Sequence, residues 1–335
     1  GFSGGVSNAT PTVNPKMVFQ LAGATPVTIA SSGTSSGRPV VNFTVVDSSG
    51  KFVPGLKLLG SATCGGSNMS FAIAKYDGIN WQSLISRQRY TAANVPSGKF
   101  SVVEGTTDPK PTATITTYPT VASLVENTSN NYYTYSFSTD VTNALLIDAA
   151  TADANGVTGK IANNGQLAAK DGKTIHRLAV QLCYVDPVTQ ATVRVNPYVD
   201  FTLAANGVAT PVKDAQGAFT DAKKVVDRAS CNECHSNFAQ HGGGRVDPNY
   251  CVVCHNAGTT DYNTNNPIDF KLMVHKFHMG KRLTKDYQVV GAIAKKTDTS
   301  VTPNVVTGVV YPQNQKNCVV CHDGSATAKH KTAQG

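Results

Sequence analysis

Short runs of Val, Thr, Phe and Tyr, separated by clusters of Gly, Asn, Asp, Ser and Pro, dominate residues 1–220. Apolar and polar residues alternate along 41–46, 133–137 and 175–183, which is the period-two pattern of strands with one buried face. Runs with helical periodicity are few, and β-branched residues are frequent. The pattern predicts a mainly β first domain over 1–220, built as an antiparallel sandwich or barrel.

The pattern changes after residue 220, where the chemistry-bearing residues concentrate. Six of the eight cysteines and seven of the eight histidines lie in 221–335. We therefore expect a second domain over 221–335, with short helices and otherwise little regular structure.

The sequence Cys-x-x-Cys-His occurs three times in this second region. It is the attachment site of c-type haem, in which both thiols bond to one porphyrin edge and the histidine binds the iron. A structural zinc site and a thioredoxin-like redox pair are the alternatives, but neither requires a histidine directly after the second cysteine. We expect a haem-packed domain with three covalently bound haem c groups, attached through Cys231, Cys234, Cys251, Cys254, Cys318 and Cys321, with His235, His255 and His322 as proximal ligands.

Five histidines lie outside these motifs, and three haems need three more ligands for complete bis-histidine coordination. His275 and His278 are three residues apart in a segment expected to be helical, so they share one face and must serve different haems. His241 follows the first motif by six residues, too few to pass easily around a haem, so we expect it to serve a neighbouring one. This surplus of histidines disfavours the alternative axial ligands, Met273 and Met279.

Two histidines, His176 and His330, remain beyond these needs. His176 falls on the apolar face of a predicted strand, where a core histidine is the ordinary case. His330 lies near the end of the sequence, in a stretch of small and basic residues. If copies of the chain form a homopolymer, His330 is the first candidate, and His176 the second, to bind a haem of the neighbouring copy. The alternative for His330 is a solvated histidine in a disordered tail.

The net charge of +8 does not by itself indicate a nucleic-acid partner. Residues 1–220 hold 15 basic and 12 acidic side chains, whereas 221–335 hold 14 and 9, so the excess lies mostly with the haem motifs. Haem propionates are anionic and attract counter-charges, and no nucleic-acid-binding module is recognisable. We expect counter-charges and a solvated rim from Lys271, Lys276, Lys281, Arg282 and Lys285.

Cys64 and Cys183 belong to no haem motif. Haem attachment of this kind implies an oxidising compartment, where an even remainder of cysteines favours a disulfide between distant strands. The alternative is two buried free thiols that pack as small hydrophobic groups. We expect a Cys64–Cys183 disulfide inside the β domain.

No stretch approaches the ~20 apolar residues of a membrane-spanning helix, and no cleavable signal is visible at the start of the sequence. Haem is joined to such motifs on the outer side of the cytoplasmic membrane. We therefore expect an exported protein whose signal peptide has already been removed.

The haem-motif region resembles the outer-surface decahaem cytochromes of the OmcA/MtrC type. In those proteins the first haem motif is followed by His-Gly-Gly-x-Arg and then by the second haem motif. The sequence Asp-Phe-Lys-x-Met-x-His-Lys-x-His-Met-Gly comes next, and Tyr-Pro precedes the third haem motif. The matching segments are 241–245, 251–255, 269–280 and 311–322. Weaker matches occur in 43–56, 71–81, 133–140 and 175–180.

The resemblance implies a β-barrel-like first domain followed by a haem domain, and a role in anaerobic respiration at the outer surface of a Gram-negative-type bacterium. It implies as partners other redox cytochromes and an extracellular acceptor such as a metal oxide, an electrode or a shuttle. The relatives carry ten haems and an N-terminal lipid-bearing cysteine, whereas this sequence has three haem motifs and no such cysteine. We expect either a fragment of a longer protein or a short protein whose conduction continues into neighbours.

These observations predict an electron carrier rather than an enzyme, because histidine on both sides of each iron leaves no open position. The alternative is a multihaem reductase with one open-site catalytic haem, for which the sequence supplies no distinct catalytic motif. A third hypothesis makes the β domain a binding module for mineral, flavin or polysaccharide.

Overall fold

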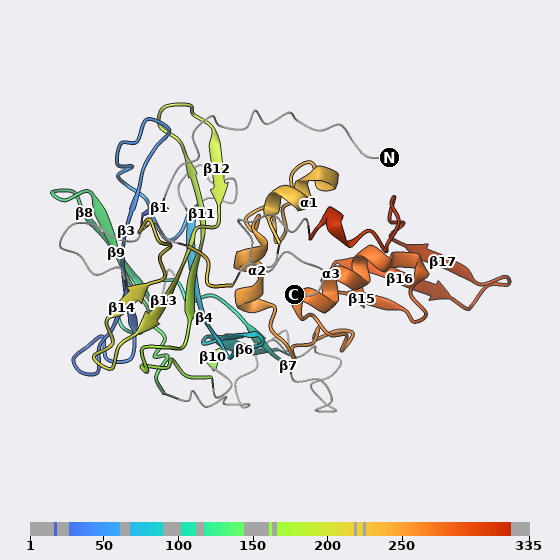
Figure 1. Ribbon diagram of the computed structural model, residues 1–335, viewed down its shortest axis with the longest axis horizontal. Coiled ribbons are helices and arrows are strands. Elements are labelled where there is room, and N and C mark those ends of the chain that lie inside the picture. The colour runs from blue at the N-terminus through green and yellow to red at the C-terminus, as the bar shows by residue number, and fades with distance from the viewer. Residues whose placement is uncertain are drawn as a thin grey trace.

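The computed structural model describes residues 17–18, 27–60, 68–89, 102–111, 117–143, 161–162, 166–217, 220–223 and 226–322. Two antiparallel sheets pack face to face in the first part of the chain. Three short helices and a small sheet form the part that carries the haem motifs (Figure 1).

The first sheet has the order β1-β3-β9-β8, with β2 paired to β3. Val41 and Phe43 of β3 lie opposite Tyr135 and Tyr133 of β9, so the predicted alternation of 41–46 and 133–137 is confirmed. The strands are β1 (Met17–Val18), β2 (Val27–Ile29), β3 (Pro39–Val45), β8 (Ser123–Asn127) and β9 (Tyr132–Ser136).

The second sheet has the order β14-β13-β11-β4-β5, with β12 paired to β11. Its central strand is β11, which pairs with β4 on one side and with β13 and β12 on the other. The strands are β4 (Asn68–Tyr76), β5 (Trp81–Ser83), β11 (His176–Val185), β12 (Thr192–Val195), β13 (Tyr198–Leu203) and β14 (Ala209–Pro211).

The main hydrophobic core lies between these two sheets. Phe71 of β4 stacks on Tyr135 of β9 with ring centres 3.7 Å apart, and Leu178 and Val180 of β11 are fully buried beside them. The first part is therefore a sandwich. The barrel alternative, including the barrel-like domain that the resemblance implied, is wrong for the described residues, since none of their sheets closes on itself.

The outer face of the second sheet is covered by a helix, so β11 is buried on both faces. Ala72, Ala74 and Ala179 are fully buried there, and their small side chains let Tyr250 and Val253 of the helix approach closely. This helix, α2 (Pro248–Cys254), contacts β4, β5, β7 and β11. It joins the sandwich to the haem-motif region.

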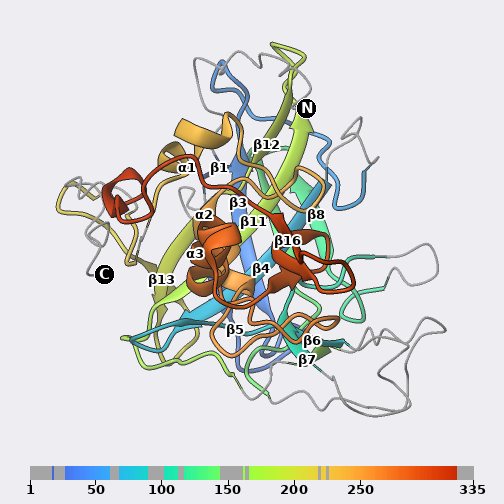
Figure 2. The same cartoon turned by 90° about the vertical axis from the view of Figure 1, so that its right-hand side faces the viewer.

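The remaining helices and small sheets complete the chain, and in the turned view α3 and β16 lie in front of the sandwich (Figure 2). No helix among the described residues is long and apolar enough to cross a membrane. The helices are α1 (Arg228–His235), α3 (Phe270–Met279) and the 3₁₀ turns Gly280–Arg282 and Cys318–Val320. The strands are β6 (Ser86–Arg89), β7 (Val102–Gly105) and β10 (Ile161–Ala162) in one sheet, and β15 (Tyr287–Val289), β16 (Ala292–Asp298) and β17 (Val305–Gly308) in another.

Candidate haem-binding site

Each Cys-x-x-Cys-His motif lies on a short helical segment or at its end. The first motif occupies the end of α1, and the second ends α2, where the His255 N–H donates to the Cys251 carbonyl. The third lies on the 3₁₀ turn Cys318–Val320. A helical turn places both thiols and the following imidazole on neighbouring points of the backbone, as haem attachment requires.

Helix α3 carries His275 and His278 on one side. The Asp269 carboxylate accepts from the Leu272 N–H and begins the helix, and Gly280 ends it. Gly280 has φ +52°, and a Cβ there would lie 2.1 Å from the Val309 carbonyl oxygen, so only glycine fits.

Three histidine pairs form between the motifs and the three predicted distal ligands. The ring centres of His235 and His278 lie 5.9 Å apart. Those of His255 and His241 lie 6.0 Å apart, and those of His322 and His275 lie 6.3 Å apart. Every motif histidine therefore faces one of the predicted distal histidines, and no two motifs share one.

These spacings fit imidazoles that bind one iron from opposite sides. A metal–nitrogen bond is about 2 Å and each ring centre lies about 1.1 Å beyond its nitrogen, so the ring centres should be about 6 Å apart. The two α3 histidines turn toward different motifs. His241 faces the second motif rather than the first, as expected for a histidine so close to the first motif.

Backbone carbonyls orient several of these rings. The Nδ1 atoms of His255, His275 and His278 lie 2.9, 2.7 and 2.8 Å from the carbonyl oxygens of Ile268, Lys271 and Val274. Nδ1–H donation to a carbonyl fixes the tautomer in which Nε2 has a free lone pair for the metal. In these three histidines the free nitrogen is Nε2.

The six motif thiols differ in exposure. Cys251 and Cys254 of the second motif are buried, whereas Cys234 and Cys318 of the other two are exposed. Burial raises the pKa of Cys251 to about 12, and a negative charge on Cys231 would raise it as well. Burial also raises the pKa of Cys231 to about 11, and a negative charge on Cys321 would raise it further.

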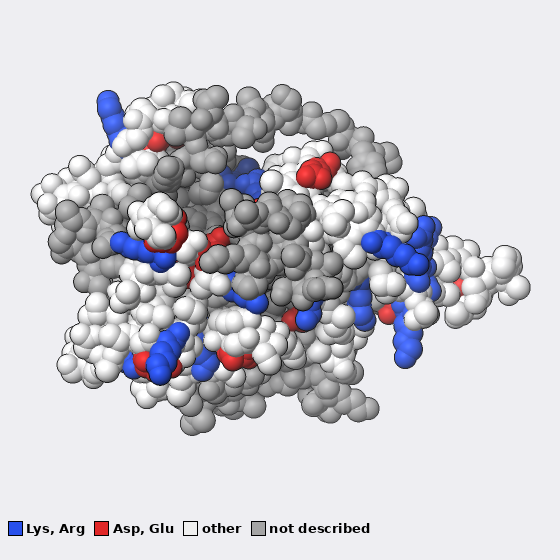
Figure 3. All heavy atoms as spheres, viewed as in Figure 1, with Lys and Arg blue, Asp and Glu red and all other residues white. Residues whose placement is uncertain are grey.

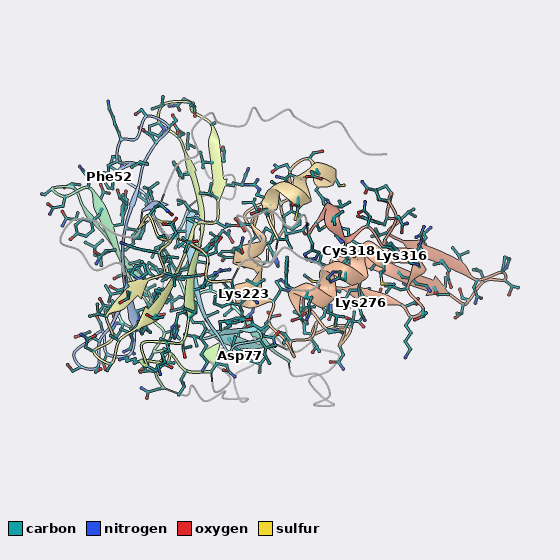
Figure 4. The ribbon with its side chains drawn as sticks, in the orientation of Figure 1. Phe52, Asp77, Lys223, Lys276, Lys316 and Cys318 are labelled. Carbon is teal, nitrogen blue, oxygen red and sulfur yellow. The ribbon has the colours of Figure 1, made fainter. Side chains whose placement is uncertain are left out.

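Several basic residues are exposed in the motif region. Lys271, Lys281 and Lys285 are exposed near α3, where Figure 3 shows Lys and Arg side chains gathered. Figure 4 shows Cys318 and Lys316 close to α3, in the segment where Gln315 Nε2 donates to the Met279 carbonyl at 3.0 Å. Among the described residues, no three His, Cys, Asp or Glu side chains are placed to hold a metal ion by themselves, as the zinc alternative would require.

Of the remaining predicted residues, the structure describes His176 and Cys183, both in β11 of the sandwich. His176 is fully buried and stacks on Phe201 at 5.6 Å, with the Ala169 N–H donating to its Nε2. This placement leaves it no access to a partner molecule and corrects the suggestion that it binds across a contact. Cys183 is disulfide-bonded. Cys64 and His330 lie outside the described residues, so the Cys64–Cys183 pairing and the role of His330 stay predictions.

Two basic residues near the second motif lie in the matching segments 175–180 and 241–245, but no role was predicted for them from the sequence. Arg177 is completely buried in β11 and bonds to the Asn249 carbonyl of α2 at 3.2 Å. Arg245 lies 5.7 Å from the ring of Tyr250, and its charge also acts on Cys254. An arginine inside an apolar strand was the available indication for Arg177, because a charge there must have a buried partner.

The comparisons with known proteins fit this geometry. Residues 223–334 match the family model of outer membrane cytochrome MtrC/MtrF-like, domains II/IV. The sequence is 25% identical to the multiheme cytochrome MtrC of Shewanella baltica (strain OS185) in an alignment over 229 residues. This alignment covers 61% of this chain and 30% of that protein. The outer membrane decaheme cytochrome OmcA has a similar fold, with a TM-score of 0.55 at 20% identity, covering 96% of this chain and 41% of that one. The chain thus spans less than half of either relative.

Proposed function

We propose that this chain, which resembles the OmcA/MtrC-type outer-surface multihaem c-type cytochromes, carries three covalently attached haem c groups. In this proposal it relays electrons toward acceptors outside the cell. Haem c, when bound, supplies an iron that cycles between the ferric and ferrous states. The protein supplies the attachment, the axial ligands and the surroundings that set the potential.

The observation that carries the proposal is the set of three histidine pairs. His278 would serve the haem of the first motif, His241 that of the second and His275 that of the third, because these pairs lie 5.9, 6.0 and 6.3 Å apart. The hydrogen bonds at Nδ1 leave Nε2 of His255, His275 and His278 free to bind a metal. With two of these histidines on each iron, no axial position would remain for a substrate.

This ligand set favours an electron carrier over the multihaem reductase. A reductase needs an iron with one open axial position, but each motif histidine here faces a second imidazole. Outer-sphere transfer needs only short separations between haems. His278 and His275, three residues apart on α3, face the first and third motifs, which supports closely spaced sites.

For location and partners, the resemblance supports an exported protein that acts at the outer surface or outside the cell. We propose redox cytochromes as electron donors and a metal oxide, an electrode or a soluble shuttle as acceptor. Conduction beyond three haems would need neighbouring haem domains or a homopolymer, in which His330 is the candidate ligand across the contact. Electron microscopy of native material tests the polymer, and exclusively monomeric particles would exclude it.

Rapid mixing tests the function. The haem-loaded protein, reduced with dithionite and freed of excess reductant, should be reoxidised by a soluble ferric complex with all of its haem absorbance returning to the ferric form. The same reduced protein should not bind carbon monoxide, which requires an open ferrous position. Stoichiometric carbon monoxide binding, together with turnover of nitrite or peroxide, would support the reductase instead.

A further inference from the structure

A fully buried arginine lies on the face of the sandwich that meets the haem-motif region. Arg177 Nε donates to Asp200 Oδ1 at 2.7 Å and Nη2 donates to Oδ2 at 2.8 Å, and both side chains are completely shielded from solvent. The two residues are paired across β11 and β13. The bidentate geometry fixes the plane and direction of the guanidinium.

Two aromatic rings hold the same guanidinium from within the sandwich sheet. Its central carbon lies 4.4 Å from the ring centres of both Trp81 and Tyr198. Contacts of a cation with aromatic faces at this distance are attractive and strengthen when water is excluded. Arg177 therefore has one well-defined position.

From that position, Arg177 reaches the segments on either side of the first haem motif. Nη1 donates to the Asn249 carbonyl at 3.2 Å, two residues before Cys251, and Nη2 donates to the Lys223 carbonyl at 3.0 Å. Figure 4 shows Lys223 where the sandwich meets α2. A planar group with five donors can make all these bonds at once, whereas a lysine ammonium cannot.

Further buried contacts hold the second motif to the sandwich on its other sides. The Ser83 N–H donates to Asn256 Oδ1 at 2.7 Å, directly after the motif. The Val246 N–H donates to Asn196 Oδ1 at 2.6 Å, shortly before it. A Cβ on Gly105 of β7 would lie only 2.7 Å from the Cys254 Cα.

We propose that Arg177 is the positioning residue of the second haem site, so that the sandwich acts as a rigid mount for one haem of the three. The inference rests on the proposed function. Buried ion pairs contribute little net stability compared with apolar groups of the same size, so stability alone does not account for this one. A fixed guanidinium does account for the placement of α2, because it holds the Asn249 carbonyl and thereby the orientation of both thiols and of His255 relative to His241.

The test is Arg177→Lys in the full haem-loaded chain, with Arg38→Lys as the matched control. Arg38 lies directly before β3 of the other sheet, where it donates to the Ser138 carbonyl at 3.1 Å. Redox titration followed by EPR should show three haems in both variants. In Arg177→Lys one component should shift in potential and in its EPR signature while the other two stay unchanged, and in Arg38→Lys all three should match the wild type.

Gly105→Ala is the second variant, because its Cβ would press on the Cys254 backbone while leaving the contacts of Arg177 in place. It decides the matter if Arg177→Lys does not accumulate. It should shift the same component, and that component should be the one that becomes high-spin in His241→Ala. The inference is overturned if Arg177→Lys accumulates and leaves this component unmoved, or if all three components move together. Where Arg177→Lys does not accumulate, an unmoved component in Gly105→Ala overturns it. A wild-type protein without three attached haems would instead refute the proposed function, so the two failures are distinguishable.

Discussion

Replacing His278 with alanine should create one five-coordinate haem and leave two unchanged. His278 faces His235 with ring centres 5.9 Å apart, and the ring of its other neighbour, Tyr311, lies 5.4 Å away. Without the imidazole, the haem of the first motif would keep one protein ligand. About a third of the ferric haem should therefore become high-spin, since one of three equal sites loses its ligand.

The same substitution should barely alter the stability of the fold. His278 is only partly buried on α3, and alanine has the highest helix propensity, so the free energy of unfolding should change by no more than about 1 kcal/mol. Quantitative EPR on the ferric protein measures the high-spin share, and chemical denaturation measures the stability. Lys271→Gln, an exposed change on the same helix, is the control and should give no high-spin haem.

A double variant makes this assignment specific. In a chain with Cys231→Ala and Cys234→Ala, which cannot attach the first haem, His278→Ala should add no high-spin signal. In that same chain, His275→Ala should still convert the haem of the third motif to high spin. High-spin haem caused by His278→Ala in the chain without the first haem would refute the pairing of His278 with the first motif.

Three further predictions follow from other parts of the chain. Cys64 and Cys183 should resist alkylation in the unfolded haem-loaded chain until a reductant is added. Their disulfide should contribute roughly 4–5 kcal/mol to the free energy of unfolding in the chain-entropy model. Alkylation at both sites without reductant would contradict the disulfide. Burial lowers the pKa of His176 from 6.5 to about 4. On acidification the unfolded chain therefore binds a proton at His176 before the folded chain does. The free energy of unfolding should fall by about 3 kcal/mol as the pH drops from 6.5 to 4. Denaturation of wild type and His176→Gln should show this difference, and parallel pH profiles would exclude it. Gly280→Ala should destabilise the haem-motif region by about 1–3 kcal/mol, because its Cβ meets the Val309 carbonyl; an unchanged unfolding midpoint would show that the loop adapts.

The strands of the sandwich could be predicted from alternation, but their arrangement could not. Alternation in 41–46 and 133–137 identifies one buried face per strand and holds equally for a sandwich and a barrel. The second buried face of β11 was not recognised, because Ala179 and Arg177 do not form an apolar stripe. Their burial depends on α2, which comes from a distant part of the sequence.

The candidate site shows the same limit. Motif spacing predicts the proximal histidines, and the three-residue interval between His275 and His278 predicts that they serve different haems. Which motif each one faces depends on how α3 is placed relative to α1 and the segment with Cys318, which local sequence does not encode. Arg177 was missed because an arginine in a strand usually lies on the surface, and only the tertiary fold surrounds it with Asp200, Trp81 and Tyr198.

The measurement that tests the central claim most directly is a count of haems and of their spin states on one preparation of the ferric protein. Intact mass should show three attached haem groups, and quantitative EPR with near-infrared magnetic circular dichroism should assign all three to low-spin iron with two histidine ligands. Fewer than three haems, or one stoichiometric high-spin or histidine–methionine haem, would contradict the ligand set of His241, His275 and His278.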